Sequence, residues 1–231
     1  MKKYWIFALL LGFVQGLSAQ NNEVSKLSSF KEESDPRSTA ILKKVKDTYE
    51  SYKSMEVAFT LTIDIPEQDT EVQKGSIAQK GDKYHLQLGS QEIISDGSTL
   101  WFHLKNNNEV QINSLDGEED SEEILSPQAL MRIYESDQYL SFLANEMTKN
   151  GKTLQYIEFK PTDRDSEYSK LKVLVNKKNN QVEEIMVFAK DGSRFTLAID
   201  KLTPNKNFEE AYFRFDASKY PGIHVEDLRV D

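Results

Sequence analysis

The sequence predicts a mainly β protein with helices, an open antiparallel β-barrel of about eleven strands whose concave face is covered by helices acting as a lid. Three observations predict this fold class. Apolar and polar residues alternate with a period of two in many short segments, turn-forming residues separate these segments, and two stretches carry helical spacing. Strongly twisted open sheets of this size tend to curl, so we expect a barrel or half-barrel.

The first predicted strand, at 56–65, shows the alternation most clearly, because Val57, Phe59, Leu61 and Ile63 are separated by small or polar residues. Gly- and Asn-rich turns then divide the following segments. Further strands are expected at 73–80, 83–88, 91–95, 99–104, 109–113, 139–147, 153–160, 170–176, 181–189, 193–202 and 210–216, with a last segment at 223–228. We therefore expect eleven or twelve strands in one antiparallel sheet.

Two helices are expected, and each begins with a capping residue followed by proline. The first, at about 36–53, follows Asp35 and carries Ile41 and Val45 in an apolar stripe. The second is shorter, at about 127–136. Its apolar residues are Leu130, Met131, Ile133 and Tyr134. Both helices are natural covers for the part of the sheet that does not close.

Residues 1–19 are typical of a cleavable secretory signal peptide, with Lys2 and Lys3 before an apolar run and small residues before Gln20. The apolar run is about half the ~20 residues that a membrane-spanning helix needs. Residues 20–34 are expected to form a flexible leader, and 35–231 a single domain. The predicted location is the periplasm.

Composition restricts the possible partners. The chain has 29 basic and 38 acidic residues, a net charge of −9, which becomes −11 when Lys2 and Lys3 are removed with the signal peptide. This balance disfavours nucleic acid and anionic membrane surfaces. The absence of cysteine excludes disulfides, thiolate nucleophiles and thiolate metal sites.

Motifs for catalysis or cofactor binding are missing from the sequence. His85, His103 and His224 lie in three different predicted strands, without the spacing of a zinc site. Three Asp-Gly pairs are typical of hairpin turns, and the acidic run at 117–123 is typical of a solvated loop. We therefore predict no catalytic residue, no metal and no cofactor, and expect a binding protein instead of an enzyme.

The apolar strand faces leave two interpretations open. In the segment SDGSTLWFHL (95–104), Leu100, Phe102 and Leu104 point to one side, whereas Trp101 and His103 point to the other. Such faces fit a filled protein core and a ligand cavity equally well. Periodicity does not separate the two.

Several stretches, in order along the chain, resemble the periplasmic outer-membrane lipoprotein carrier proteins of the LolA family. They are GSIAQKGDKYHLQL (75–88), SDGSTLWFHLKNNNEV (95–110), SPQAL (126–130), KDGSRFTLAI (190–199) and FRFDASKYPGIHVEDLR (213–229). The resemblance implies an open β-barrel with a helical lid over an apolar cavity. It also implies a carrier that takes the acyl chains of lipoproteins from the inner to the outer membrane.

This resemblance implies a set of lipid-binding residues and partners. The expected lining is Ile41, Val45, Phe59, Leu61, Ile63, Tyr84, Leu86, Leu88, Leu100, Phe102, Leu130, Met131 and Ile133. The implied partners are acylated lipoproteins, the inner-membrane lipoprotein-releasing ABC transporter complex and an outer-membrane acceptor of undetermined identity, bound by a monomer. The alternative is a carrier or sensor of another envelope lipid, or a regulator of envelope stress, on the same fold.

One position departs from the family pattern. Family members commonly carry a basic residue and a proline after the strand that begins like GSIAQ, and the arginine is thought to hold the lid. Here Lys80 and Gly81 occupy these positions, which makes Lys80 the candidate for lid locking. Lysine lacks the planar fork with which arginine binds several acceptors, so we expect weaker or different locking.

Overall fold

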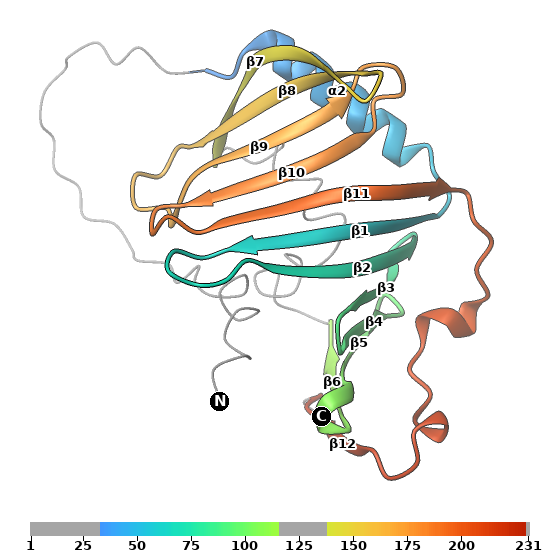
Figure 1. Ribbon diagram of the computed structural model, residues 1–231. Helices are drawn as coiled ribbons and strands as arrows, with labels where there is room; N and C mark the ends of the chain where they lie inside the picture. The colour runs from blue at the N-terminus through green and yellow to red at the C-terminus, as the bar shows by residue number, and fades with distance from the viewer. Residues whose placement is uncertain (1–32, 116–137, 230–231) are drawn as a thin grey trace, which may run out of the picture.

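The structure, a computed structural model, describes residues 33–115 and 138–229, and these form one large, curled, open β-sheet (Figure 1). The sheet has twelve strands. They are β1 (Met55–Asp64), β2 (Glu71–Lys80), β3 (Lys83–Leu88), β4 (Gln91–Ser95), β5 (Thr99–Leu104), β6 (Glu109–Ser114), β7 (Tyr139–Lys149), β8 (Lys152–Pro161), β9 (Tyr168–Asn176), β10 (Val182–Ala189), β11 (Arg194–Pro204) and β12 (His224–Asp227). The prediction of a mainly β fold with a large curled sheet is confirmed.

The sheet is built from two antiparallel meanders, β7 to β11 and β1 to β6, which meet in its middle where β11 pairs with β1. The strand order is β12-β6-β5-β4-β3-β2-β1-β11-β10-β9-β8-β7, so β1 pairs with β11, and β7 and β12 are the edges. All pairs are antiparallel except β12 with β6, which is parallel. The expectation of a wholly antiparallel sheet is wrong at this edge, because the chain crosses the sheet before β12 and returns in the direction of β6.

Turn chemistry explains why the meanders form where the sequence predicts them. Asn150 and Gly151, between β7 and β8, have φ values of 52° and 74°. Two successive residues with positive φ favour a tight hairpin turn whose twist matches that of the flanking strands. Asparagine and glycine adopt this conformation most readily, so the sequence fixes the turn locally.

Helix α2 (Pro36–Glu50) begins as predicted, with Asp35 at the N-cap and Pro36 in the first turn. The Asp35 carboxylate accepts a hydrogen bond of 2.8 Å from the backbone N–H of Arg37, which satisfies one free donor of the first turn. The helix ends three residues before the predicted boundary at 53.

A lid of several helices has no support in the structure. Within residues 33–115 and 138–229, α2 is the one α-helix, and it packs into a hydrophobic cluster. The second predicted helix, at 127–136, lies outside the described residues.

The segment that follows β11 differs from its prediction. The strand expected at 210–216 does not form: the short 3₁₀ turn η3 (Glu210–Phe213) lies there, and a second one, η4 (Ala217–Lys219), follows it. Phe208 and Phe213 are buried in a cluster with Ala78 of β2, and Phe213 is 0% exposed. Packing of these aromatic rings across the sheet, and not pairing along it, decides the conformation of residues 205–223, which we call the C-terminal strap.

Candidate functional site

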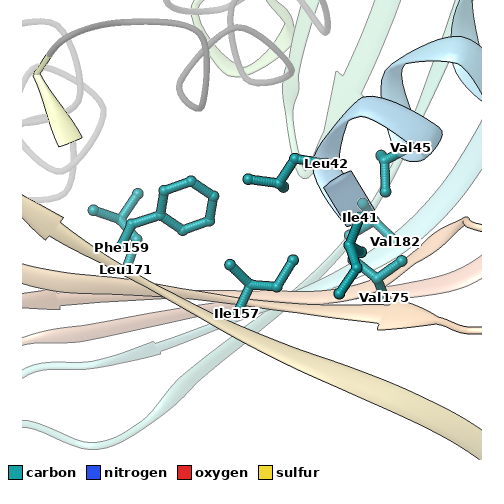
Figure 2. Close-up of a cluster of buried hydrophobic side chains, with 8 residues drawn as sticks. All are labelled: Ile41, Leu42, Val45, Ile157, Phe159, Leu171, Val175 and Val182. Atoms are coloured by element: carbon teal, nitrogen blue, oxygen red, sulfur yellow. The ribbon is translucent and has the colours of Figure 1, made fainter. Parts of the chain in front are cut away.

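The two faces of the sheet carry different covers. Ile41, Leu42 and Val45 of α2 pack on one face, which we call the α2 face (Figure 2). Their partners in this cluster are Ile157, Phe159, Leu171, Val175 and Val182 of β8 to β10. The C-terminal strap packs on the opposite face, the strap face, because its contact Ala78 alternates with the α2-face residues of β2.

Strand register carries the α2 face from this cluster to the middle of the sheet. On β9 and β10, Val173 is paired with Ile185, which in turn is paired with Leu197 of β11. Leu197 is paired with Leu61 of β1. Because paired residues lie on the same side of a sheet, these four side chains form one apolar row.

A second row continues across the other meander. Val57 of β1 is paired with Ile77 of β2, and Ile77 with Leu86 of β3. Leu86 is paired with Ile93, and Ile93 with Phe102 of β5. Apolar residues therefore reach across the α2 face from β8 to β5, with a step along β1 from Leu61 to Val57, because Gln73 of β2 lies opposite Leu61.

All eight strand residues expected to bind lipid lie on the α2 face, as the register requires. They are Phe59, Leu61, Ile63, Tyr84, Leu86, Leu88, Leu100 and Phe102. Leu61, Leu86 and Phe102 are half-buried and the others are buried. The helix residues Ile41 and Val45 are buried against this face. The last three expected residues, Leu130, Met131 and Ile133, lie outside the described residues.

The apolar face extends further than the sequence analysis proposed. Phe195, Leu197 and Ile199 of β11 lie opposite Ile63, Leu61 and Phe59, and all three are half-buried. Their signal was present in the sequence, because the predicted strand at 193–202 alternates in the same way. They were missed because the pairing of β1 with β11 joins residues about 140 apart, which periodicity does not reveal.

Helix α2 covers one part of this face. A separate apolar cluster lies on the other meander, where Tyr84, Ile93 and Leu100 are buried and Leu86, Phe102 and Leu115 pack against them. This cluster contains no residue of α2. Among the described residues, the helix therefore fills the β8–β10 part of the face and leaves the β1–β5 part to other contacts.

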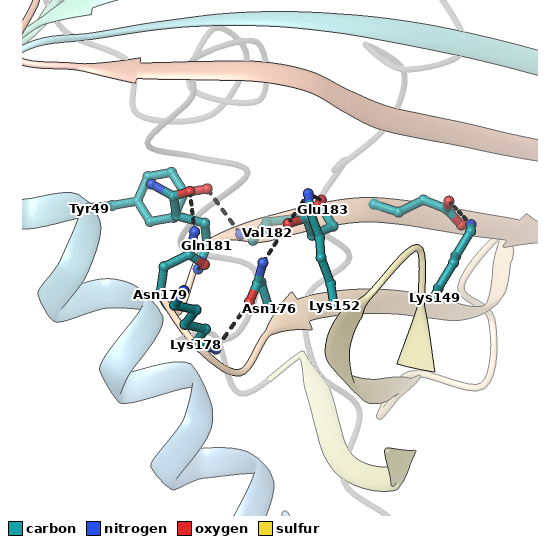
Figure 3. A network of polar contacts seen from close by, with 10 residues as sticks. Tyr49, Lys149, Lys152, Asn176, Lys178, Asn179, Gln181, Val182 and Glu183 are labelled. Atoms are coloured by element: carbon teal, nitrogen blue, oxygen red, sulfur yellow. Dashed lines mark hydrogen bonds and ion pairs between the residues drawn. The ribbon is translucent and has the colours of Figure 1, made fainter. Parts of the chain in front are cut away.

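Hydrogen bonds fasten α2 to the sheet at both ends. Near its start, the hydroxyl of Ser38, which is 0% exposed, lies 2.9 Å from the backbone O of Ser141 on β7 and 2.8 Å from its hydroxyl. Near its end, the backbone N–H of Val182 donates to the hydroxyl of Tyr49 at 3.2 Å (Figure 3). Burial raises the pKa of Tyr49 to about 12. These contacts make α2 a fixed part of the fold.

A close approach in the middle of the α2 face depends on a glycine. Phe59 of β1 is paired with Gly75 of β2, and the phenyl ring lies over the glycine backbone. A Cβ atom on Gly75 would lie 2.4 Å from Cζ of Phe59. The glycine therefore lets the ring lie low on the sheet, where it forms part of the floor of the apolar face.

Lys80, the candidate for lid locking, lies on the strap face. Its Nζ donates to Oε1 of Glu210 at 2.7 Å and to the backbone O of Phe208 at 3.3 Å. Lys83 forms an ion pair with the same glutamate. Since Lys80 alternates with the α2-face residues of β2, its ammonium group reaches the C-terminal strap and not a cover on the α2 face.

The strap face contains a buried polar cluster that the sequence analysis did not find. His85 Nε2 lies 2.6 Å from Oε1 of Glu92, and His103 Nδ1 lies 2.8 Å from Oε2. Burial opposes ionisation of Glu92, but hydrogen bonds from the two histidines outweigh it and lower the pKa of the carboxyl to about 2. Alternation predicts the face on which each of these residues lies. The contacts between them depend on the register of β3, β4 and β5.

The described residues contain neither a metal-binding cluster nor a membrane-spanning helix. No group of three or more histidine, aspartate or glutamate side chains in residues 33–115 and 138–229 is arranged to hold a metal ion. In the same residues, no helix has the length and apolar character needed to cross a membrane.

Comparisons with known proteins agree with this geometry. The model of the family described as outer membrane lipoprotein carrier protein LolA matches residues 50–216. A search of curated proteins finds no match. Among solved structures, an uncharacterized conserved protein from Thermus thermophilus is similar with a TM-score of 0.56 and 12% identity, covering 83% of this chain and 99% of that chain.

Two further solved structures are more distant. A LolA superfamily protein from Nitrosomonas europaea has a TM-score of 0.40 and 14% identity, over 77% of this chain and 97% of that chain. The lipoprotein LppX from Mycobacterium tuberculosis has a TM-score of 0.40 and 11% identity, over 76% of this chain and 100% of that chain.

Fold and site define an open, curled β-sheet protein with an apolar face that continues beyond its helix. Because the family model matches well over half of the sequence, the chain belongs to the outer membrane lipoprotein carrier protein LolA family.

Proposed function

We propose that this protein binds the acyl chains of lipoproteins or of another envelope lipid on the α2 face, and that it carries them through the periplasm. The observation that carries the proposal is the pair of apolar rows on the α2 face, which together reach from β8 to β5 and of which α2 packs against one part. Family membership supports a carrier and not an enzyme. The proposed partners are acylated lipoproteins, an inner-membrane releasing transporter and an outer-membrane acceptor.

Simple energetics explain why such a ligand needs a protein. Each buried methylene contributes ~0.8 kcal/mol, so a sixteen-carbon chain contributes ~12 kcal/mol when it leaves water. This corresponds to a dissociation constant of about 1 nM, so a single acyl chain would escape slowly without help. Release therefore requires an acceptor of higher affinity or a competing contact within the protein.

The proposed site lies where the apolar face has half-buried side chains. Leu61 and Leu197 form a cross-strand pair in the middle of the sheet. Leu86 and Phe102 belong to the second row, which leaves β1 at Val57 because the partner of Leu61 on β2 is the polar Gln73. These residues offer contact area to an alkyl chain, and their strands hold them in fixed register. We expect the acyl chain to cross β11 and β1 at Leu197 and Leu61, and to continue along β1 towards Ile77 of β2 and Leu86 of β3.

A pair of variants on one strand tests this site. Leu61→Glu places a carboxylate on the α2 face, whereas Thr62→Glu places the same group on the opposite face one residue later. Leu86→Glu repeats the test on β3. We expect Leu61→Glu and Leu86→Glu to stay folded and lose uptake of a triacylated lipoprotein, because an ionised carboxylate is costly to bury with an alkyl chain. Thr62→Glu should retain uptake.

Uptake is measured by native mass spectrometry of protein purified without detergent, with circular dichroism as the control for folding. A one-to-one complex with the lipoprotein supports the carrier, and a complex with phospholipid in its place supports the alternative of another envelope lipid. If the wild type takes up neither ligand, or if Leu61→Glu and Thr62→Glu take up lipid equally, the proposed site is wrong.

A further inference from the structure

The buried cluster on the strap face holds one histidine between two hydrogen-bond acceptors. His85 of β3 is held between two groups: Glu92 of β4 on one side and the backbone of Tyr212 in the strap on the other. Its ring is buried, and its centroid lies 4.8 Å from that of the Tyr212 ring. None of these groups takes part in the function proposed above.

Both ring nitrogens of His85 face hydrogen-bond acceptors. Nε2 lies 2.6 Å from Oε1 of Glu92, and Nδ1 lies 3.1 Å from the carbonyl O of Tyr212. The amide nitrogen of Gln87 lies farther from Nε2, at 3.4 Å, and donates to Oε1 of Glu92 at the shorter distance of 3.1 Å. A carbonyl oxygen accepts and does not donate, and an ionised carboxylate also accepts. A neutral imidazole has one N–H and could satisfy one of the two, so its bare nitrogen would face an oxygen lone pair. Both contacts are satisfied when the ring carries two protons.

His103 provides a contrast within the same cluster. Its Nδ1 lies 2.8 Å from Oε2 of Glu92, and its ring packs edge-on against Phe215 and Tyr220 of the strap. A neutral ring with the proton on Nδ1 satisfies this contact. One imidazolium beside one carboxylate leaves the cluster neutral, whereas a second would bury an additional charge against aromatic rings.

From this geometry we infer that His85 is an imidazolium when the strap is docked, and that docking of the strap takes up a proton. The imidazolium joins the sheet to the strap, because it donates to Glu92 with one nitrogen and to the Tyr212 carbonyl with the other. Loss of that proton removes one of the two hydrogen bonds. The attachment of the strap to the sheet is then weaker at η3.

Other charged and polar groups contact the cluster from neighbouring elements. Lys105 approaches Oε2 of Glu92 at 3.7 Å from the sheet, and Gln87 donates to Oε1 at 3.1 Å. Near the start of the strap, Glu210 is paired with Lys80 and Lys83. The remaining ionisable groups of the strap and its surroundings are Glu56, Lys206, Glu209, Tyr212, Asp216, Lys219 and Tyr220, together with Arg214, which pairs with Asp96 at 3.6 Å. The pKa of Glu92 is lowered to about 2, so the carboxylate is ionised wherever histidine titrates.

The sign of the pH dependence follows from proton uptake. A docked strap holds one proton more than a released strap in which His85 is neutral, so rising pH favours release. The docking equilibrium falls by up to tenfold for each pH unit over the range in which the docked ring keeps its proton and the released ring has lost it. It becomes independent of pH again once the docked ring has also lost its proton.

Nitrogen-15 NMR of the histidine rings tests the protonation state directly, because imidazolium and the two neutral tautomers have distinct shifts. The experiment uses the whole chain between about pH 5 and pH 8, the range in which histidine ordinarily changes charge. At neutral pH we expect two protonated nitrogens in His85 and a single proton on Nδ1 in His103. A neutral tautomer of His85 at neutral pH overturns the assignment. His224, exposed on β12, serves as the internal reference.

Hydrogen exchange of the strap tests the coupling. After correction for intrinsic exchange, protection of amides in 208–215 should fall as the His85 signal changes to that of the neutral ring. His85→Gln keeps one donor but cannot take up a proton, so its strap protection should be lower and independent of pH. The matched control, His224→Gln, should behave as the wild type. Unchanged protection while His85 loses its proton overturns the coupling, as does a wild-type pH dependence in His85→Gln.

Discussion

Replacement of Gly75 by alanine is the sharpest test of how the floor of the apolar face is built. The new Cβ would lie 2.4 Å from Cζ and 2.6 Å from Cε2 of Phe59, and 2.8 Å from the backbone O of Gln87 on β3. Two of these atoms belong to a buried ring that is 5% exposed, and the third belongs to the neighbouring strand. The ring and the strand spacing must both adjust.

The expected cost combines two opposing effects. Overpacking of a tight core site costs ~1–3 kcal/mol. Alanine in place of glycine within a strand recovers ~0.5–1 kcal/mol, because the unfolded chain loses less backbone freedom on folding. We expect a net loss of ~1–2 kcal/mol in the free energy of unfolding. For a domain of this size that lowers the melting temperature by roughly 2–8 °C.

Urea denaturation and thermal melting measure this loss, and Ser76→Ala is the matched control. Ser76 is the next residue of β2 and lies on the strap face, so its replacement should change stability by less than about 0.5 kcal/mol. If Phe59 is the main obstacle, Gly75→Ala should cost less in a Phe59→Leu background, with a coupling energy of at least ~0.5 kcal/mol. Acyl-chain uptake should also fall in Gly75→Ala, because the displaced ring projects from the floor.

Two results would refute this reasoning. Gly75→Ala could prove neutral or stabilising, which would mean that the ring does not lie over the glycine. Equal costs of Gly75→Ala in the wild-type and Phe59→Leu backgrounds would show that the ring is not the group that clashes.

Three further predictions concern the anchoring of α2 and the buried cluster. Leu42→Ala should lower the free energy of unfolding by ~2–5 kcal/mol in urea melts, because Leu42 is 4% exposed and its loss leaves a cavity against β8–β10. Ser38→Ala should cost ~1–3 kcal/mol, since Ser141 loses its buried partner; exposed Thr39→Ala should cost less. The pKa of Glu92 is lowered from 4.5 to about 2 in the folded protein. The contribution of its carboxylate to the free energy of unfolding is therefore complete above about pH 4.5 and is lost as the pH falls towards 2. Over that range the free energy of unfolding of the wild type should fall by up to ~3 kcal/mol more than that of Glu92→Gln, as measured by urea denaturation at each pH.

Sequence periodicity was sufficient to predict the strands that form and the face on which their side chains lie, although it also predicted a strand at 210–216 that is absent. Alternation of apolar and polar residues is a local property, and Phe59, Leu61, Leu86 and Phe102 each lie on the side that their neighbours predict. The start of α2 was predictable for the same reason, because Asp35 caps the helix through a contact two residues away.

Long-range pairing was decided by the tertiary structure. The contact of Leu61 with Leu197, which joins the two meanders, depends on which strand edges meet after the chain has folded. The C-terminal strap shows the same limit. Its alternating residues around Phe213 fit a strand, yet burial of the ring against Ala78 gives a 3₁₀ turn in its place.

The sequence by itself determined that an apolar face exists, which residues of β1, β3 and β5 belong to it, and that the chain resembles the LolA family. The tertiary structure decided that α2 covers one part of this face, that Lys80 holds the strap, and that His85, Glu92 and His103 meet. The physical reason is that side-chain direction follows from the backbone period of a single strand, whereas burial and pairing depend on register between distant strands.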